Sequence, residues 1–282
     1  MLSVSMLCSY DYCKRKLFLN YVLGLREPYK KATSLGTIRH ETYDQINKIE
    51  ESLVKSITEL KTKEELGALY KAKYRGILTN IIKNNKKPLE ELNLKLNDVF
   101  QDIWPLILEE SEIRSDKIYQ FILNNNIFGE ELWGKIIPKI KSELRVESEE
   151  LHLKGIIDQL DIYPDAVIPI DIKTGSMPKE GVWPSHKIQI AAYAMLAEEK
   201  FNKEIKEGFI HYLDYKEKRR IPINIFLKDD IKELVKKVEN ILKNKELPPV
   251  VENTNKCTNC GLKDVCGNEN ELKKTIDSIK TN

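Results

Sequence analysis

AVIPIDIKTG, residues 166–175, is the stretch that decides the fold. Side chains alternate between the two faces of an extended chain, so Asp171 and Lys173 share one face while Ile170 and Ile172 share the other. We therefore expect a strand with core on one face and chemistry on the other, open to solvent. The carboxylate can bind a divalent cation, and the ammonium can steady a phosphate or a nucleophilic water. An exposed Asp/Lys pair on an edge strand is the other interpretation.

The 282 residues of the chain can bury a full core, in one large domain or two small ones. The net charge of +2 arises from 46 basic and 44 acidic residues, so there is no global attraction to nucleic acid. Any phosphate-binding surface must come from local runs, and otherwise such runs are solvated faces. The candidate runs are Lys14, Arg15 and Lys16, and Lys216, Lys218, Arg219 and Arg220.

The sequence has neither a signal-peptide pattern at its start nor an apolar run of about 20 residues. We therefore expect a cytoplasmic protein without a membrane partner. In a reducing compartment its five cysteines are poor disulfide candidates, and they gather at the two ends. Thiolates suit iron–sulfur clusters or zinc, although a zinc site more often uses two close cysteine pairs. Here Cys257 and Cys260 form one such pair, followed by Cys266, with Cys8 and Cys13 near the other end.

The first half of the sequence is typical of helices. Residues 5–22 predict one helix with Ser5 as a possible cap, and a second helix starts with Thr33 or Ser34. Gly36 and His40 share a face of that second helix. Further helices are expected at about 50–60, 63–84 and 89–110, with shorter pieces to 137.

The periodicity changes at Glu143 and predicts strands in the second half. Ser185 is the expected cap of a helix on which Gln189 and Tyr193 lie one turn apart. The expected strands cover residues 142–148, 151–163, 166–174, about 206–214 and about 219–225, and an amphipathic helix follows at about 228–245.

Four short motifs occur in a set order: Gly36-x3-His40, Gly155-x2-Asp158, Asp171-x-Lys173 and Gln189-x3-Tyr193. In this order they resemble the PD-(D/E)xK nuclease superfamily, in its RecB-type branch. The resemblance implies an α/β fold with a restriction-endonuclease-like core, in which helices flank a mixed central sheet. It also implies a helical insertion and a C-terminal iron–sulfur segment. We expect a single compact nuclease domain made of N-terminal helices (1–46), helical insertion (47–140), nuclease core (141–250) and cluster segment (251–282).

The resemblance also implies how a metal would be held. Asp158 and Asp171 would be ligands, His40 would complete the shell, and the backbone carbonyl of Ile172 would contribute. Phosphodiester hydrolysis uses such a cation to polarise the phosphoryl oxygen and to lower the pKa of a bound water. An imidazole ligand suggests tolerance of manganese beside magnesium.

The remaining motif residues would act on water and substrate. By resemblance, Lys173 positions the attacking water, and Gln189 and Tyr193 orient the substrate strand or the catalytic groups. Tyr193 is the aromatic residue that we expect to contact unpaired bases. Each residue also has an ordinary interpretation, and Asp161 in particular is expected to be a solvated strand acid.

The cysteine spacing resembles the iron–sulfur arrangement of RecB-type nucleases, which implies a [4Fe–4S] cluster that ties the two ends of the domain together. Cys13 is the expected fourth ligand because Cys13-Lys14-Arg15 resembles the family's Cys-Pro-Arg segment, and Cys8 is then a buried thiol. The expected ligands are Cys13, Cys257, Cys260 and Cys266.

With that cluster, the chain is most similar to the CRISPR-associated RecB-like nucleases, the fourth family in the Cas numbering. The resemblance implies a metal-dependent exonuclease on single-stranded DNA, acting 5′ to 3′ beside integrase proteins in CRISPR adaptation. A RecB-like nuclease of DNA repair or of a mobile element is one alternative. A catalytically silent DNA-binding or assembly module is another, and the intact His40, Asp158, Asp171 and Lys173 argue against it.

Overall fold

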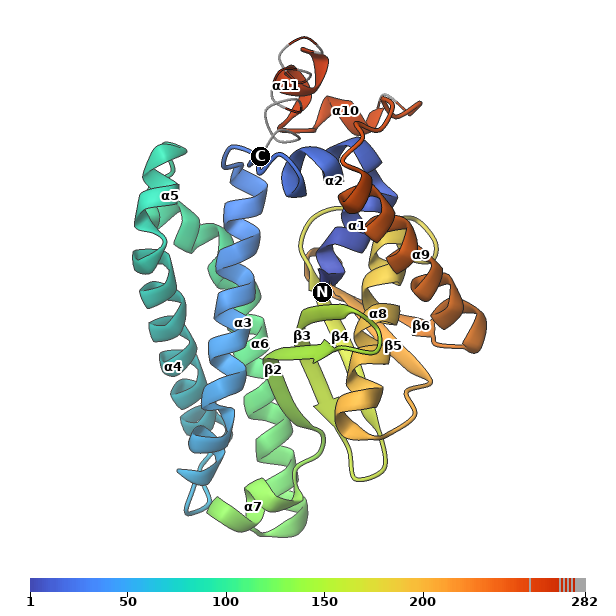
Figure 1. The fold of residues 1–282 in the computed structure, drawn as a ribbon. Coiled ribbons are helices and arrows are strands. Elements are labelled where there is room, and N and C mark those ends of the chain that lie inside the picture. Colours follow the sequence, from blue (N-terminus) through green and yellow to red (C-terminus); the bar gives the residue numbers. More distant parts are fainter. Residues whose placement is uncertain (254, 269, 271, 273, 275, 277–282) are drawn as a thin grey trace. The chain divides into compact units, whose positions relative to one another are not determined.

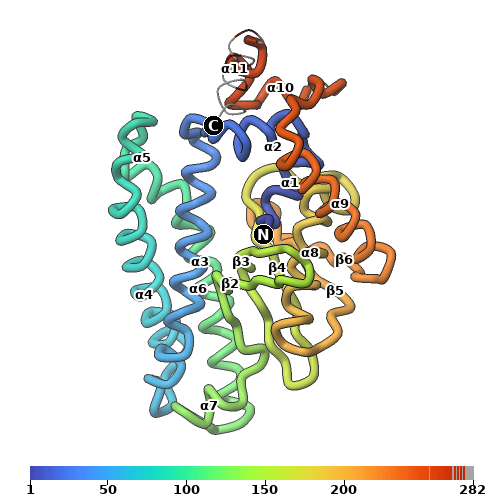
Figure 2. Tube along the Cα trace, viewed as in Figure 1, coloured from blue at the N-terminus to red at the C-terminus, as the bar shows by residue number. Residues whose placement is uncertain are grey.

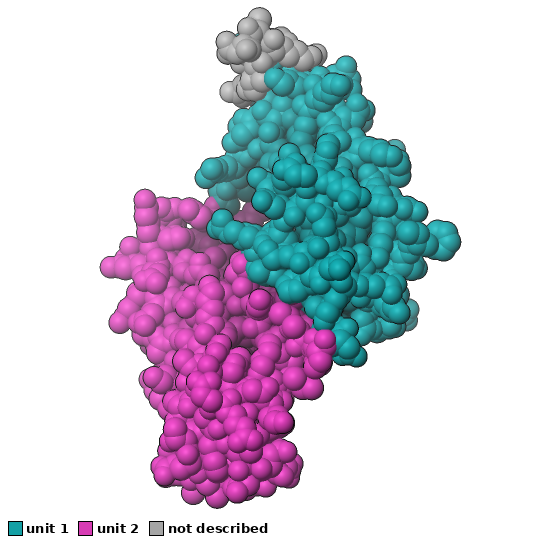
Figure 3. All heavy atoms as spheres, turned by 60° about the horizontal axis from the view of Figure 1, so that its bottom comes forward, with its two compact units in different colours: residues 1–28, 144–157, 165–282 teal, residues 29–143, 158–164 magenta. Residues whose placement is uncertain are grey.

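The computed structural model describes residues 1–253, 255–268, 270, 272, 274 and 276. The chain forms two compact units, which Figure 3 colours separately. Unit 1 comprises residues 1–28, 144–157 and 165–282, and unit 2 comprises residues 29–143 and 158–164.

One mixed sheet contains six strands of the described chain, and Figure 1 shows helices around it. The strands are β1 (Leu2–Ser3), β2 (Lys139–Ser148), β3 (Leu153–Ile162), β4 (Val167–Lys173), β5 (Glu207–Tyr212) and β6 (Glu217–Pro222). Their order is β1-β3-β4-β5-β6, with β2 paired to β3. β4 runs parallel to β5, and β6 is antiparallel to β5. The predicted mixed sheet flanked by helices is confirmed.

The helices of unit 1 centre on α8, which packs on β4 and β5 and against α1 and α9. Alanines and one glycine bring α8 close to the sheet. A Cβ on Gly208 would lie 2.6 Å from the Ile190 side chain and 3.0 Å from the Pro169 carbonyl oxygen. The helices are α1 (Val4–Tyr12), α2 (Lys14–Tyr21), α8 (Pro184–Phe201), α9 (Ile225–Asn244), α10 (Asn255–Thr258) and α11 (Lys263–Gly267), with the 3-10 helix η1 (Leu213–Tyr215).

The single helix predicted over residues 5–22 is wrong, because the chain breaks at Cys13 into α1 and α2. Cys13 is extended (φ −165°, ψ 115°), its N–H bonds Ser9 O, and its sulfur accepts from the Lys16 N–H at 3.4 Å. The predicted caps are also wrong, since the residues that precede α1, α3 (Lys31–Lys55) and α8 are Ser3, Lys30 and Trp183, respectively. None of these three caps through its side chain, so composition could not identify them.

Unit 2 consists largely of helices, and α3 carries His40. α4 matches the prediction of 63–84 to the residue. The predicted 50–60 helix overlaps only the end of α3, which stops at Lys55. The predicted 89–110 helix is divided between α5 and α6, and α6 begins at Leu96 and runs through Pro105 to Asn125. The helices are α3 (Lys31–Lys55), α4 (Lys63–Asn84), α5 (Lys86–Glu91), α6 (Leu96–Asn125) and α7 (Gly129–Lys135).

A buried polar network joins α3 to α4 and α6. Glu50 accepts hydrogen bonds from the hydroxyls of Tyr70 and Tyr74, both at 3.2 Å. Arg114 donates to Glu110 at 2.6 Å and to Asn47 at 2.8 Å. Because each member has a partner, the network fixes the orientation of α3 within unit 2.

None of the helices that the structure describes is both long enough and apolar enough to span a membrane.

Replacing Gly208 with Ala should lower the free energy of unfolding by about 1–3 kcal/mol, because the added methyl group meets backbone as well as side chain. Urea unfolding measures the change. Gly67→Ala in α4 is the control, since a Cβ there has no neighbour within 4 Å, and it should leave stability unchanged or raise it by up to about 1 kcal/mol. A Gly208→Ala protein as stable as the parent would contradict this close packing.

Candidate functional site

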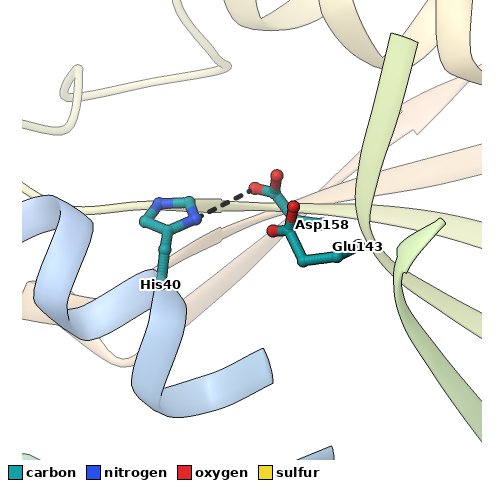
Figure 4. A group of neighbouring side chains, drawn as sticks. All are labelled: His40, Glu143 and Asp158. Carbon is teal, nitrogen blue, oxygen red and sulfur yellow. Dashed lines mark ion pairs between the residues drawn. The ribbon is translucent and has the colours of Figure 1, made fainter. Parts of the chain in front are cut away.

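His40, Glu143 and Asp158 form a group in unit 2 that is suited to hold a cation (Figure 4). The Nδ1 atom of His40 lies 3.5 Å from Oδ2 of Asp158, and one ligand atom from each residue lies within 4.8 Å of the others. Figure 4 shows the imidazole, on α3, facing the two carboxylates. An imidazole and carboxylates are ligands that manganese and magnesium accept.

Glu143 is the member that the sequence-based analysis missed. In the sequence, Glu143 lies where the strand periodicity begins, and the alternation of side chains predicts no special role for it. Its backbone is left-handed (φ 48°), an uncommon and costly conformation for a residue other than glycine in a strand. Glu143 is exposed as a residue, but partial desolvation raises the pKa of its carboxyl, and the nearby Asp44 and Glu41 raise it further, while Lys48 opposes them.

Asp171 is completely buried, so the prediction that its face of β4 opens to solvent is wrong. α8 packs on β4 and covers the Asp171 face, since Lys173 of that face bonds Gln189 of the helix. Ile170 and Ile172 on the other face are buried as well. The Nζ atom of Lys173 lies 2.7 Å from Asp171 Oδ2, but at an angle that makes no hydrogen bond. Among the described residues, neither oxygen of Asp171 accepts one. A buried carboxylate in this state fits a cation ligand.

A chain of hydrogen bonds links the third and fourth motifs. Lys173 donates to Oε1 of Gln189 at 2.9 Å, and Nε2 of Gln189 donates to the hydroxyl of Tyr193 at 3.1 Å. Tyr193 is only 5% exposed, and its ring would lie 2.7 Å from a Cβ on Gly155. The glycine of the second motif therefore makes room for the tyrosine of the fourth. The expectation that Tyr193 offers its ring to bases is wrong.

His186 and Cys8 lie near the Asp171/Lys173 pair. His186 Nδ1 is 3.0 Å from the Tyr212 hydroxyl, and burial together with the charge of Lys173 lowers the pKa of His186 to about 4. Cys8 donates to the Ser185 carbonyl at 3.4 Å, and burial raises the pKa of its thiol to about 12.

Asp161 differs from its expected role as a solvated acid. It is buried and accepts a hydrogen bond of 2.7 Å from Nε2 of Gln159. A short strand pattern could not show this, because burial here comes from tertiary packing.

Four cysteines line one cavity of about 250 Å³ in unit 1: Cys13, Cys257, Cys260 and Cys266. Figure 2 shows α2 beside the C-terminal segment with α10 and α11. The Tyr12 hydroxyl donates to the Lys256 carbonyl at 2.7 Å, which joins the two ends of unit 1. Among the described residues, no three of these sulfur atoms lie within 4.8 Å of one another.

Several members of the two basic runs proposed as phosphate patches bind protein groups. Arg15 is buried and donates to the carbonyls of Pro248 and Cys266, both at 3.1 Å, while Lys16 pairs with Glu27. In the second run, Arg219 and Arg220 pair with Glu217 and Glu207, respectively. Arg15 and Arg219 therefore have structural roles. A run of basic residues in the sequence does not show whether its side chains bind protein groups or face solvent.

Comparison with known proteins gives consistent matches. The PD-(D/E)XK nuclease superfamily matches residues 1–267. A CRISPR-associated exonuclease Cas4/endonuclease Cas1 fusion from Leptospira interrogans is 29% identical over 171 residues, covering 56% of this chain and 30% of that protein. A fusion of the same description from Myxococcus xanthus is 30% identical over 133 residues, 46% of this chain and 23% of that protein.

The DNA replication ATP-dependent helicase/nuclease JHS1 of Arabidopsis thaliana is 24% identical over 153 residues, covering 47% of this chain and 11% of that protein. The chain thus spans less than a third of the length of each of these three relatives.

The environment of His186 predicts a pH dependence of stability. Its folded pKa of about 4 lies below the ordinary value of 6.5, so the unfolded chain takes up a proton first as the pH falls. The contribution of His186 is complete above pH 6.5 and is lost between about pH 6.5 and 4. Urea unfolding across this window should show a shallower pH slope for His186→Asn than for the parent. Equal slopes in the parent and in His186→Asn would contradict the prediction.

Proposed function

Since the chain belongs to the PD-(D/E)XK nuclease superfamily, we propose that it is a divalent-metal-dependent deoxyribonuclease, which degrades single-stranded DNA from its 5′ end and processes spacer precursors in CRISPR adaptation. The buried Asp171 carboxylate, which lacks hydrogen bonds among the described residues and lies 2.7 Å from the Lys173 ammonium, carries the proposal. A buried acid in this state is costly for stability, which favours a catalytic role over a structural one.

Two sets of ligands would hold the metal. Unit 2 offers His40 and Asp158, to which we add Glu143, and unit 1 offers Asp171 and the backbone carbonyl of Ile172. The motif order, as in the family, assigns both sets to one reaction. Magnesium or manganese bound there would polarise the phosphoryl oxygen and lower the pKa of a bound water.

The ammonium of Lys173 would position the attacking water and stabilise the charge that develops on the phosphate. Gln189 holds this ammonium from one side through its carbonyl oxygen, and the Tyr193 hydroxyl accepts from the amide of Gln189. Because Tyr193 is packed on Gly155, the hydrogen-bond chain ends on a fixed ring. The roles of Gln189 and Tyr193 are then to orient Lys173, not to contact bases.

Replacing Asp171 with Asn or Lys173 with Ala should reduce cleavage at least about 100-fold, since either change removes several kcal/mol of transition-state stabilisation. The assay follows labelled single-stranded DNA in manganese, in magnesium and in chelator. Asp171→Asn keeps the side-chain volume and removes a buried charge, so its melting temperature should not fall. Asp165→Asn, at an exposed acid of the same unit, should cleave like the parent, and parent-level activity in either site variant would overturn the assignment.

The biological context is also part of the proposal. The Leptospira and Myxococcus relatives join a Cas4 exonuclease to a Cas1 endonuclease in one chain, which supports a CRISPR integrase protein as partner. The Arabidopsis helicase/nuclease supports a second candidate, a nuclease of DNA replication or repair. Substrates labelled at the 5′ or the 3′ end, single-stranded or duplex, separate these candidates by polarity and by strand preference.

We further propose that Cys13, Cys257, Cys260 and Cys266 hold a [4Fe–4S] cluster. All four line one cavity, whereas Cys8 bonds Ser185 elsewhere in unit 1. A structural zinc site more often uses two close cysteine pairs, whereas this sequence offers one, Cys257 and Cys260, which favours a cluster over zinc. Basic side chains that line the cavity would offset the negative charge of the cluster; they are Arg15, Lys16, Lys256 and Lys263.

Protein purified without air should contain about four irons per chain and absorb near 400 nm. Ala substitution of Cys13 should lower the iron content and the melting temperature together, because the cluster joins both ends of unit 1. Cys8→Ala is the matched control, and it should keep both the iron and the colour. Zinc without iron in the anaerobic protein, or bleaching by Cys8→Ala but not by Cys13→Ala, would contradict the assignment.

A further inference from the structure

Residues 174–183, here called the 174–183 loop, leave the end of β4 directly after Lys173 and lead into α8. The nuclease proposal assigns no role to this loop. Its sequence, TGSMPKEGVW, contains two glycines, one proline and a terminal tryptophan, Trp183. Such a composition is typical of a flexible loop.

The structure instead shows a loop fixed by side chains of the β5–β6 hairpin. Arg219, whose side chain is 13% exposed, donates to the carbonyls of Pro178 at 2.7 Å and Lys179 at 3.3 Å, and also to that of Gly181. Asp214 accepts from the Gly175 N–H at 2.6 Å, where the backbone is left-handed (φ 96°). Because one arginine donates hydrogen bonds to three carbonyls of the loop, the loop is held in place, whereas its composition predicts flexibility.

Trp183 is held at the end of this loop with its ring accessible. Its indole N–H donates to the Ser176 carbonyl at 3.0 Å. Trp183 is nevertheless 41% exposed. An exposed indole with a fixed orientation can stack on a flat ligand at little cost in conformational entropy.

The position of Trp183 relates it to the proposed site. Trp183 is the residue before α8, and Gln189, which bonds Lys173, lies six residues later. Six residues of helix span about 9 Å. A nucleotide stacked on Trp183 would therefore lie within a few nucleotides of a phosphate at Lys173. The neighbouring loop and hairpin also present exposed lysines, Lys179 and Lys218, which suit a phosphate backbone.

We propose that the Trp183 ring, held by the Arg219-anchored 174–183 loop, is a stacking platform for an unpaired base of the DNA substrate. The inference rests on the proposed function and supplies the aromatic contact that Tyr193, buried against Gly155 of β3, cannot make. Stacking on an aromatic ring is tolerant of sequence and requires the base to be unpaired, so it would favour single strands over duplex.

Binding in chelator tests the platform separately from cleavage. The full-length protein with its cluster is titrated into a fluorescent single-stranded oligonucleotide and a matched duplex, followed by anisotropy. Trp183→Ala should weaken single-strand binding between about fivefold and 100-fold and duplex binding much less. Trp183→Phe should retain most of the affinity, because an aromatic face remains. No side-chain cap bond is lost in either variant, and circular dichroism and iron content check that the protein is intact.

Phe226→Ala is the matched control, since Phe226 is a 77% exposed aromatic residue of the same unit, on α9. It should bind both substrates like the parent. Arg219→Gln, which releases the loop carbonyls, should weaken single-strand binding in the same direction as Trp183→Ala. A parent protein that binds no DNA would defeat the proposed function itself. If the parent protein binds DNA and Trp183→Ala binds it equally well, the stacking platform is wrong while the proposed function stands.

Discussion

The buried carboxylate of Asp171 is the constraint on which the rest of unit 1 depends. Taking an ionised acid out of water costs several kcal/mol unless other groups compensate. The Lys173 ammonium at 2.7 Å compensates in part, but no hydrogen bond from the described residues reaches either oxygen. The fold tolerates this because α8 is packed closely enough, over Gly208, to keep Lys173 in place through Gln189. The buried carboxylate of Asp171 therefore lowers the stability of the fold, and a cation bound to it would restore that stability.

A second constraint joins the ends of the chain, and it does not depend on the proposed cluster alone. Arg15 sits inside unit 1 and satisfies two carbonyls of the C-terminal segment, and Tyr12 satisfies a third. Between these two residues the helix breaks at Cys13, which turns its sulfur toward the cavity shared with the C-terminal cysteines. The helix break, the buried guanidinium of Arg15 and Cys13 therefore act together at one turn of the chain. It places a thiol at the cavity and binds the C-terminal segment to the same turn.

Local patterns predicted the strands β2 to β6, the helix at 63–84 and the order of the four motifs, because these follow from alternation, helical periodicity and short spacings. They did not predict β1, which has only two residues. These patterns gave wrong predictions where long-range packing determines the environment of a residue. The burial of Asp171 depends on α8, the solvation of Asp161 on its tertiary surroundings, and the function of Arg15 on a segment more than 230 residues away. Glu143 was missed for a related reason. Only the fold brings its carboxylate to His40 and Asp158.

The two aromatic residues of the α8 region illustrate why exposure, not motif membership, has to decide a role in binding. Tyr193 belongs to a motif, yet its ring is enclosed against Gly155 and its hydroxyl serves Gln189. Trp183 belongs to no motif, yet the loop that holds it is bound by both terminal nitrogens of the Arg219 guanidinium and leaves Trp183 exposed. Both residues are attached to the helix that orients Lys173. A displacement of α8 would therefore disturb Lys173 and the exposed Trp183 together. Under the roles proposed for these two residues, α8 would couple strand binding to hydrolysis.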